Sequence, residues 1–185
     1  MFTATILQTQ RLTLAPLELA DIPAIFEIAK ERRSIEDFQY VASNLDDVKA
    51  WLEPSYYDAN NLIWVIHKHN QAIGLFDVCF EAEYSDLETN VCRVGYFLDF
   101  REHNQGYTTE ALLIVIDWLF RCTDVERIEA GVTLKNIPSY RVLEKAGFIR
   151  DKVVQNNWKW YEDLYDSAYY YLLRPLIQSQ KTASR

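Results

Sequence analysis

The 185-residue sequence lacks the long apolar runs that mark membrane proteins. No stretch approaches the ~18 apolar residues that a membrane-spanning helix needs. Residues 1–7 carry no basic side chain before their apolar stretch, so they do not resemble a secretory signal. Internal repeats, low-complexity tracts and interior linkers are also missing. We therefore expect a cytoplasmic protein with no membrane contact, folded as one domain over residues 1–178, with a disordered tail over 179–185.

Cysteine and histidine are scarce. The three cysteines, Cys79, Cys92 and Cys122, and the three histidines show no spacing typical of a metal site, so we predict no metal. Cys79 and Cys92 could face each other across neighbouring strands. Reduced thiols in the core are the interpretation we favour, because disulfides are rare in the cytoplasm.

Positive charge is also in deficit. There are 19 Lys and Arg residues against 27 Asp and Glu, which gives a net charge of −8. Direct nucleic-acid binding needs a cationic surface, so the composition argues against that function. An acidic protein is compatible with a cationic amine substrate, but its charge does not identify one. Tyrosine and tryptophan are abundant, with 12 and 5 residues, and their concentration near the C-terminus predicts strands there.

Hydrophobic periodicity predicts a mixed α/β sheet. We expect a first strand over 5–16 and a helix from Ile22, capped by Asp21. A shorter helix over 48–52 would be capped by Asn44 or Asp46 and stopped by Pro54. The remaining predictions are strands over 62–67, 72–80 and 90–99, a helix over 108–120, a strand over 127–132, a helix over 138–146, and strands over 153–161 and 164–173.

The segment 103–112, His-Asn-Gln-Gly-Tyr-Thr-Thr-Glu-Ala-Leu, is a glycine-containing turn between a predicted strand and a predicted helix. The free N–H groups of a helix start, together with its dipole, favour phosphate. Gly106 lets the backbone come close to a ligand. A diphosphate could therefore take hydrogen bonds from the amides of Gln105, Gly106, Tyr107, Thr108 and Thr109. Alternatively, the segment is a plain strand-to-helix turn with a flexible glycine.

A second segment, 136–148, reads Asn-Ile-Pro-Ser-Tyr-Arg-Val-Leu-Glu-Lys-Ala-Gly-Phe. Asn136 is a good helix N-cap, and Pro138 suits a first helical turn. Gly147 suits the position just after the helix, where the chain turns back into a strand.

Together the two segments resemble the GNAT superfamily of acetyl-CoA-dependent N-acetyltransferases, over almost the whole chain from about Leu7 to Leu173. The family's phosphate turn has Arg or Gln, then Gly, then Gly or Ala, at the places of His103, Gly106 and Thr108 here. The second segment resembles the branch that acetylates the N-termini of ribosomal proteins. The resemblance implies a GNAT fold, with a mostly antiparallel twisted sheet of about seven strands flanked by about four helices.

The same resemblance implies which residues bind acetyl-CoA, the cosubstrate. The turn from His103 to Thr109, with Asn104 in it, would hold the diphosphate. The strand before it would splay from its neighbour, and Phe97 and Leu98 would pair with the acetyl-pantetheine arm through their main chain. Asn136 would contact the pantetheine, and Arg141 would lie near the phosphates. Each also has a structural reading: core packing for Phe97 and Leu98, capping for Asn136, and a solvated surface position for Arg141.

Two catalytic positions of the family are changed in this sequence. Arg93 stands where many members have a general-base Glu, and Leu143 stands where many have a general-acid Tyr. In the ribosomal-protein branch, a serine that matches Ser139 is thought to be the acid. By the resemblance, Ser139 lies close to the thioester sulfur, although it could simply occupy the first turn of the helix.

The general base has several candidates. Asp77 lies in an apolar run, where desolvation could raise its pKa, although alternation would also allow it to face solvent. Glu81, Glu83 and Glu88, or a chain of waters, are alternatives. Tyr140 is a further candidate acid, against which its spacing argues.

These observations predict direct acetyl transfer to a primary amine, because no serine or cysteine lies in a nucleophile-plus-base arrangement. A protein N-terminus, such as that of a ribosomal protein, is the acceptor that the branch resemblance implies. A small amine such as a polyamine, an amino acid or an aminoglycoside is the alternative. Because of Arg93 and Leu143, a non-catalytic acyl-CoA-binding protein on the same fold must also be considered. The sequence allows either a monomer or a homodimer.

Overall fold

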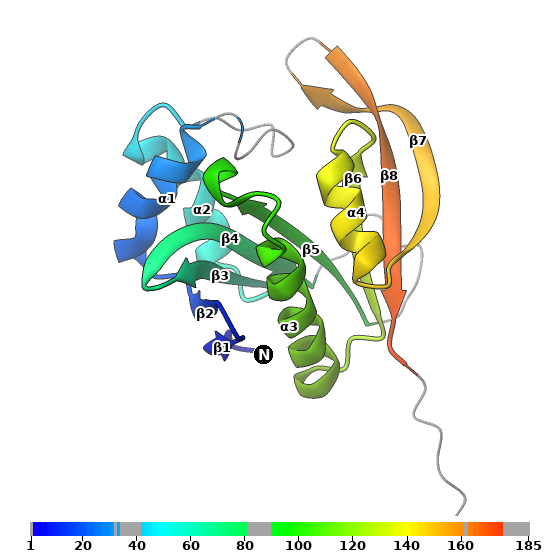
Figure 1. Ribbon diagram of the computed structural model, residues 1–185, viewed down its shortest axis with the longest axis horizontal. Helices are drawn as coiled ribbons and strands as arrows, with labels where there is room; N and C mark the ends of the chain where they lie inside the picture. Colours follow the sequence, from blue (N-terminus) through cyan, green and yellow to red (C-terminus); the bar gives the residue numbers. More distant parts are fainter. Residues whose placement is uncertain (1, 32, 34–41, 81–89, 161–162, 176–185) are drawn as a thin grey trace, which may run out of the picture.

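The computed structural model describes residues 2–31, 33, 42–80, 90–160 and 163–175, which form one eight-stranded sheet with helices on both faces (Figure 1). The strand order is β1-β2-β3-β4-β5-β6-β8-β7. Every neighbouring pair is antiparallel except β5 and β6, which are parallel. The predicted mixed α/β fold is therefore confirmed. The tail expected over 179–185, and Glu81, Glu83 and Glu88, lie outside the described residues.

The strands are β1 (Leu7–Gln8), β2 (Thr13–Pro16), β3 (Asn61–Lys68), β4 (Gln71–Cys79), β5 (Val91–Leu98), β6 (Arg127–Thr133), β7 (Ile149–Trp160) and β8 (Asp163–Leu173). The α-helices are α1 (Ile22–Ala29), α2 (Leu45–Tyr57), α3 (Tyr107–Cys122) and α4 (Ile137–Lys145). Two short 3₁₀ helices, η1 (Leu19–Asp21) and η3 (Phe100–Glu102), precede α1 and α3. No helix in the described ranges is both long and apolar enough to cross a membrane.

The N-terminal segment departs from the prediction of one strand over 5–16. It forms a tight hairpin of β1 and β2, in which Leu7 pairs with Leu14. Thr9 makes the turn, because its N–H donates to the carbonyl of Leu12 (2.9 Å) and its Oγ1 accepts from the N–H of Leu12 (2.9 Å). A Thr side chain that satisfies the backbone locally competes with continued strand pairing. This hairpin accounts for eight strands where about seven were expected.

Helix α2 is longer than predicted. Asn44 caps it, since its side chain accepts a hydrogen bond from the N–H of Asp47 (2.9 Å). Pro54 was expected to stop the helix, but the helix continues to Tyr57 with Pro54 inside. Pro54 and Ala50, whose carbonyl loses its helical partner, both lie on the exposed face, where water can replace the missing bond.

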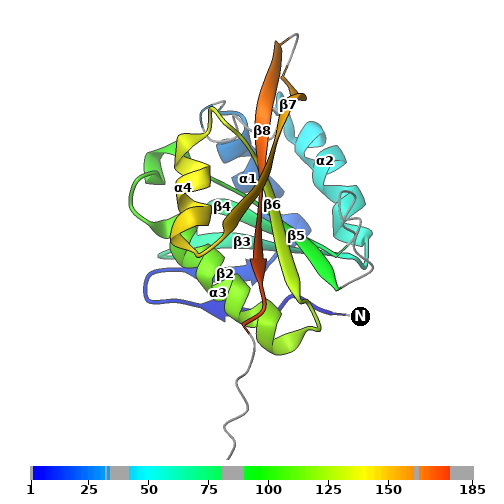
Figure 2. The same ribbon diagram turned by 90° about the vertical axis from the view of Figure 1, so that its right-hand side faces the viewer.

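The sheet separates two apolar cores. On one face, α3 and α4 pack against the sheet through residues such as Leu112, Val115 and Leu143. On the other face, α1 and α2 pack through Ile25 and Val48 among others. Figure 2 shows the α3–α4 pair and the α1–α2 pair on opposite sides of the strands, with the β7–β8 hairpin extending beyond them. In the strands near the centre of the sheet, alternate side chains therefore point into one core or the other.

The parallel strands β5 and β6 pair only at their beginnings. Their register runs from Val91 opposite Arg127 to Arg93 opposite Glu129 and then ends. Beyond that point the strands diverge, as Figure 1 shows. The splay expected from the resemblance is therefore present, because the pairing of β5 with β6 in the described sheet ends at Arg93 and Glu129.

The strand register also settles the relation between the cysteines. Cys79 lies opposite Arg93, not opposite Cys92. Cys92 is buried in the core under α3, and the next residue, Arg93, points to the other face. All three cysteines are free.

Candidate active site

A cleft of about 980 Å³ opens where β5 and β6 diverge. Its walls are Val94 to Leu98 of β5 and Ala130 to Thr133 of β6. The turn before α3 and the first residues of α4 close one side, and the β7–β8 hairpin contributes to the other. The predicted site residues that line it are Asp77, Phe97, Leu98, His103, Asn104, Gly106, Tyr107, Thr108, Thr109, Asn136, Ser139 and Arg141. Gln105 belongs to the same turn but is not part of the lining.

The turn before α3 has the backbone of an anion-binding site. Asn104 and Gly106 have left-handed φ values of 61° and 80°, and α3 begins at Tyr107 with Gly106 as its N-cap. This conformation favours glycine, which explains why Gly106 stands there. The first N–H groups of α3 have no intrahelical acceptor, and they form the positive end of the helix dipole. The arrangement suits a phosphate group.

His103 points back to the end of β5. Its Nε2 lies 2.9 Å from the carbonyl oxygen of Leu98, and because a carbonyl can only accept, this nitrogen carries the proton. The imidazole therefore ties the turn to the strand that precedes it. The Arg or Gln that the family pattern has at this place is replaced by a residue with its own structural contact.

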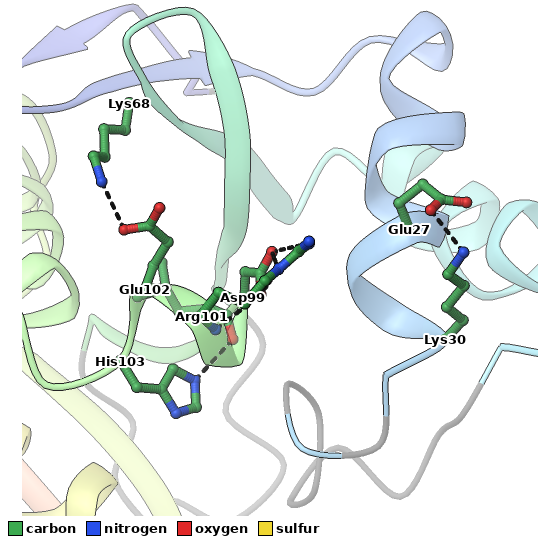
Figure 3. Close-up of polar contacts among 8 residues, drawn as sticks. Glu27, Lys30, Lys68, Asp99, Arg101, Glu102 and His103 are labelled. Atoms are coloured by element: carbon green, nitrogen blue, oxygen red, sulfur yellow. Dashed lines mark hydrogen bonds and ion pairs between the residues drawn. The ribbon is translucent and has the colours of Figure 1, made fainter.

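Two ion pairs lie next to the same turn (Figure 3). Lys68 Nζ lies 2.8 Å from Glu102 Oε2. Arg101 contacts Asp99 through Nε (2.9 Å) and Nη2 (2.5 Å). Burial by itself would raise the pKa of Asp99, but the hydrogen bonds from Arg101 hold it below its ordinary value. These ion pairs therefore support the turn, and Glu102 also contributes to the lining of the cleft.

Helix α4 brings its first turn to the cleft. Asn136 caps the helix as predicted, since its Oδ1 accepts from the N–H of Ser139 (3.0 Å). The cap fixes the position of Ser139, which is half-buried. Arg141 is exposed on the cleft side of the helix, and Lys145 follows it one turn later. Leu143, at the place of the family's tyrosine, is buried in the core.

Ser139 has a neighbour that the sequence did not indicate. The hydroxyl of Tyr96 lies 3.2 Å from Ser139 Oγ and 3.4 Å from the Ser139 carbonyl oxygen. Tyr96 projects from β5 and Ser139 from α4, so the contact joins this strand to the first turn of the helix. The ring of Tyr96 packs on Phe76, with the ring centroids 5.7 Å apart. In a strand, successive side chains point to opposite faces of the sheet, so the sequence could assign Tyr96 to one face. It could not predict that Ser139 would be the partner of Tyr96.

Asp77 belongs to β4 and lies on the opposite face of the sheet from Tyr96. It pairs across the strands with Gly95, and a Cβ at Gly95 would come within 2.5 Å of Asp77 Oδ1. The carboxylate therefore occupies space that only glycine leaves free. Desolvation raises the pKa of Asp77 to about 6, while the nearby Arg93 acts in the opposite direction. Asp77 is half-buried and lines the cleft.

The β7–β8 hairpin supplies a polar and aromatic wall that the sequence did not place at the site. Its register is irregular between Val154 and Trp158, where β7 bulges. Asn157 in this bulge accepts from Ser167 Oγ (2.5 Å) and donates to the hydroxyl of Tyr169 (2.8 Å). Bulges change the direction in which side chains point. The concentration of aromatics was visible in the sequence, but which of them face the cleft was not.

Comparisons with known proteins agree with this geometry. Residues 11–149 match the family described as acetyltransferase (GNAT) domain. The probable N-acetyltransferase YjcK of Bacillus subtilis (strain 168) is 46% identical over 66 residues, which cover 36% of each protein. The uncharacterized N-acetyltransferase YnaD of the same organism is 24% identical over 162 residues, which cover 85% of this chain and 92% of YnaD.

Solved structures share the fold. One is RimL, an α-N-acetyltransferase of ribosomal protein L7/L12, in complex with coenzyme A, with a TM-score of 0.80 and 16% identity over 91% of this chain and 98% of RimL. Another is the spermidine N-acetyltransferase of Vibrio cholerae with CoA and spermine, with a TM-score of 0.77 and 17% identity over 90% of this chain and 97% of that one. Since the family match spans most of the chain, including the turn before α3 and helix α4, the chain belongs to the GNAT family of acetyl-CoA-dependent N-acetyltransferases.

Proposed function

We propose that this protein transfers the acetyl group of acetyl-CoA directly to the α-amine of a peptide or protein N-terminus. The observation that carries the proposal is the placement of Asp77 and Ser139 around the opening between β5 and β6. Asp77 reaches the cleft from the face covered by α1 and α2, whereas Ser139 reaches it from the face covered by α4. A base and an acid on opposite sides of a thioester suit a displacement in which the amine enters on one side and the thiol leaves on the other.

Acetyl-CoA would lie along the cleft. The amides from Gln105 to Thr109 would hold the diphosphate, with Asn104 shaping the turn and His103 tying it to β5. The acetyl-pantetheine arm would pair with the main chain of Phe97 and Leu98 along the edge of β5 that lines the cleft. Asn136 would contact the arm, and Arg141 would face the phosphates.

In the reaction, the amine nitrogen attacks the thioester carbonyl carbon, a C–N bond forms and the C–S bond breaks. The proton that the nitrogen loses goes to the Asp77 carboxylate. The departing sulfur takes a proton from the Ser139 hydroxyl, and the resulting alkoxide regains a proton from solvent through the neighbouring Tyr96 hydroxyl. Each group thus performs one proton transfer, and no covalent enzyme intermediate is required.

The acidity of Asp77 bears on the choice of acceptor. An α-ammonium group has a pKa of about 7.7–8.0, whereas a lysine-type ammonium has a pKa of about 10.4. A carboxylate with a pKa of about 6 can deprotonate an α-ammonium group at a small cost in free energy. Deprotonation of a lysine-type ammonium group would cost much more, because its pKa is further above that of the carboxylate. An α-amine is also substantially neutral at physiological pH.

The charge of the cleft argues against a polycationic acceptor. Among its described lining residues, Asp77 and Glu102 are the acids, and Lys68 already neutralises Glu102. Five basic side chains line the same cleft: Arg33, Arg93, Lys135, Arg141 and Lys145. A polyamine would meet mostly like charge there, whereas a peptide with a single α-amine would not.

Release of free CoA thiol from acetyl-CoA tests the proposal. We expect turnover with short peptides that have a free N-terminus. Two matched acceptors should be poor: the same peptides with a blocked N-terminus and an internal lysine, and spermidine. Faster turnover with spermidine would contradict the proposed acceptor, and failure of acetyl-CoA to bind at millimolar concentration would contradict the acetyltransferase activity itself.

A further inference from the structure

Arg11 lies in the turn between β1 and β2, almost a hundred residues before the phosphate turn, yet it contacts that turn at several points. Its Nε lies 2.6 Å from Glu110 Oε2, and its backbone N–H donates to Glu110 Oε1 (3.0 Å). Its Nη1 donates to the carbonyl of Gln105 (3.0 Å). The guanidinium also lies over the ring of Tyr107, 4.5 Å from the centroid. One side chain thus joins the residue before Gly106, the first residue of α3 and the first turn of that helix.

Glu110 presents an electrostatic problem for an anion site. It lies in the first turn of α3, beside the N–H groups that would receive the diphosphate. Burial by itself would raise the pKa of Glu110, but hydrogen bonds from Thr9 and Arg11 hold it below its ordinary value, so the group is ionised at neutral pH. An unpaired carboxylate there would repel a diphosphate. The Arg11–Glu110 ion pair, with 18% of the Glu110 side chain exposed, neutralises that charge locally.

Gln105 presents a second problem, which concerns backbone direction. For the amides around Gly106 to point into the cleft, the neighbouring carbonyl groups must point elsewhere. The carbonyl of Gln105 is turned to Arg11, which gives it a charged hydrogen-bond donor on the far side of the turn. Arg11 itself is not among the residues that line the cleft.

A second hairpin supports the same turn. Lys68, at the end of β3, pairs with Glu102 (Figure 3). Its Nζ also lies 5.0 Å from the centroid of the Tyr107 ring. The buried ring of Tyr107 is therefore flanked by two cations, Arg11 and Lys68, which come from different hairpins. Their carboxylate partners, Glu102 and Glu110, bracket the turn in sequence.

We propose that Arg11 is a positioning residue for acetyl-CoA: it neutralises Glu110 and holds the Gln105 carbonyl so that the turn before α3 can accept the diphosphate. The inference rests on the proposed function, because it assigns a role to a residue outside the cleft in binding the cosubstrate. It predicts that Arg11 affects acetyl-CoA affinity and leaves the chemical step unchanged.

Titration calorimetry with CoA on the full chain tests this role without knowledge of the acceptor. Arg11→Gln should weaken CoA binding about tenfold, since it leaves an unpaired carboxylate beside the diphosphate. Arg11→Lys keeps the charge but cannot hold Glu110 and Gln105 together, so an about threefold loss is expected. Arg121→Gln is the matched control, because Arg121 pairs with Asp117 at the exposed far end of the same helix and should bind CoA like the wild type.

Two further measurements separate positioning from a general structural effect. In the Glu110→Gln background, Arg11→Gln should cost less affinity than in the wild type, because no charge is left to neutralise. In steady-state kinetics, Arg11→Gln should raise the KM for acetyl-CoA with kcat unchanged at saturation.

The outcomes distinguish the two levels of inference. If the wild type binds CoA and folded Arg11→Gln binds it within twofold, the role of Arg11 is wrong while the acetyltransferase function stands. If Arg11→Gln does not fold, Arg11→Lys decides, and full affinity in that variant would overturn the proposal. If the wild type does not bind CoA, both the proposed function and the role of Arg11 fail.

Discussion

The hydroxyl of Tyr96 lies 3.2 Å from Oγ of Ser139, although the two residues come from a strand and a helix that are 43 positions apart in the chain. The contact joins β5 to the first turn of α4, and both residues line the cleft in which we propose that acetyl-CoA binds. Ser139 is held from the other side, since its N–H donates to Asn136. The backbone of Ser139 is therefore held by the helix cap, and its hydroxyl is contacted by Tyr96 from the strand.

We predict that Ser139→Ala lowers kcat about 10- to 100-fold, because the departing thiolate loses its proton donor. Tyr96→Phe should lower kcat less, about 3- to 10-fold, since Tyr96 acts through Ser139. The double variant should be no slower than Ser139→Ala alone, as expected for residues that act as a unit. Thiol release at saturating substrates measures this, with Tyr56→Phe on the exposed side of α2 as a control. Additive losses, or unchanged turnover in Ser139→Ala, would show that the acid assignment is wrong.

The raised pKa of Asp77 predicts the pH dependence of the reaction. A general base works only when it is deprotonated, so kcat/KM should rise as the pH increases and level off above the Asp77 pKa of about 6. Asp77→Asn should remove this rise and lower kcat/KM about 10²- to 10³-fold. A pH profile between 5 and 8, with an acceptor whose own protonation is corrected for, provides the measurement. Persistence of the same profile in Asp77→Asn would exclude Asp77 as the base.

The same shift has a consequence for stability. The folded pKa of Asp77, about 6, lies above the ordinary value of 3.8, so the folded state holds its proton more tightly than the unfolded state. Below the pKa of the unfolded state, Asp77 is protonated in both states and its ionisation does not affect the free energy of unfolding. As the pH rises from about 4 to 6, ionisation increasingly destabilises the folded protein, and above pH 6 the cost is complete. Asp77→Asn should therefore raise the free energy of unfolding by about 1–3 kcal/mol more at pH 7 than at pH 4.

Urea unfolding of both proteins at the two pH values gives this difference directly. Asp117→Asn, an exposed carboxylate on α3, is a suitable control and should show little pH-dependent change. If Asp77→Asn changes the free energy of unfolding equally at pH 4 and pH 7, burial does not raise the pKa of Asp77.

Gly106→Ala should impair acetyl-CoA binding. An added Cβ would meet Arg11 Nη2 at 3.6 Å, an ordinary contact, so the cost comes from the φ of 80° and amounts to about 1–2 kcal/mol. Relaxation of that strain would rotate the amides of the turn, and we expect CoA affinity to fall at least tenfold. Gly147→Ala is a matched control, because Gly147 lies just after the C-terminal end of α4 and has a φ of 90°. An added Cβ there would make only an ordinary contact with Leu172 (3.8 Å). This control variant should lose similar stability but retain CoA affinity, and calorimetry distinguishes the two.

Arg174 is predicted to be a major stabilising residue of the C-terminal end of α3. Its guanidinium donates to the carbonyls of Val125 (2.9 Å), Thr123 (2.7 Å) and Phe120. These include carbonyls at and just after the helix end, which have no helical partner. Arg174→Ala should lower the free energy of unfolding by about 2–3 kcal/mol in urea denaturation, because it leaves these acceptors unpaired. Arg121→Ala, with 75% of the side chain exposed, should change it by less than about 0.5 kcal/mol.

Several features of this protein were determined by sequence alone, because they depend on neighbouring residues. Gly106 before a helical pattern predicted the turn that begins α3, and Asn136 predicted the start of α4, since caps and left-handed positions are local properties of the chain. The order of strands and helices followed from periodicity. Local reasoning was wrong where a local signal was overruled: Thr9 folds the first strand into a hairpin, and α2 continues through Pro54.

The contacts that define the site were decided by tertiary structure. Tyr96 meets Ser139, Asp77 occupies the space above Gly95, and Arg11 reaches Glu110 across 99 positions of sequence. Each contact depends on strand register, on the splay after Arg93 and on which hairpin lies below α3. These are long-range consequences of how the two cores pack on the sheet. The sequence therefore identified the motifs of a GNAT acetyltransferase, and the packing of the strands and helices determined which residues of those motifs contact each other.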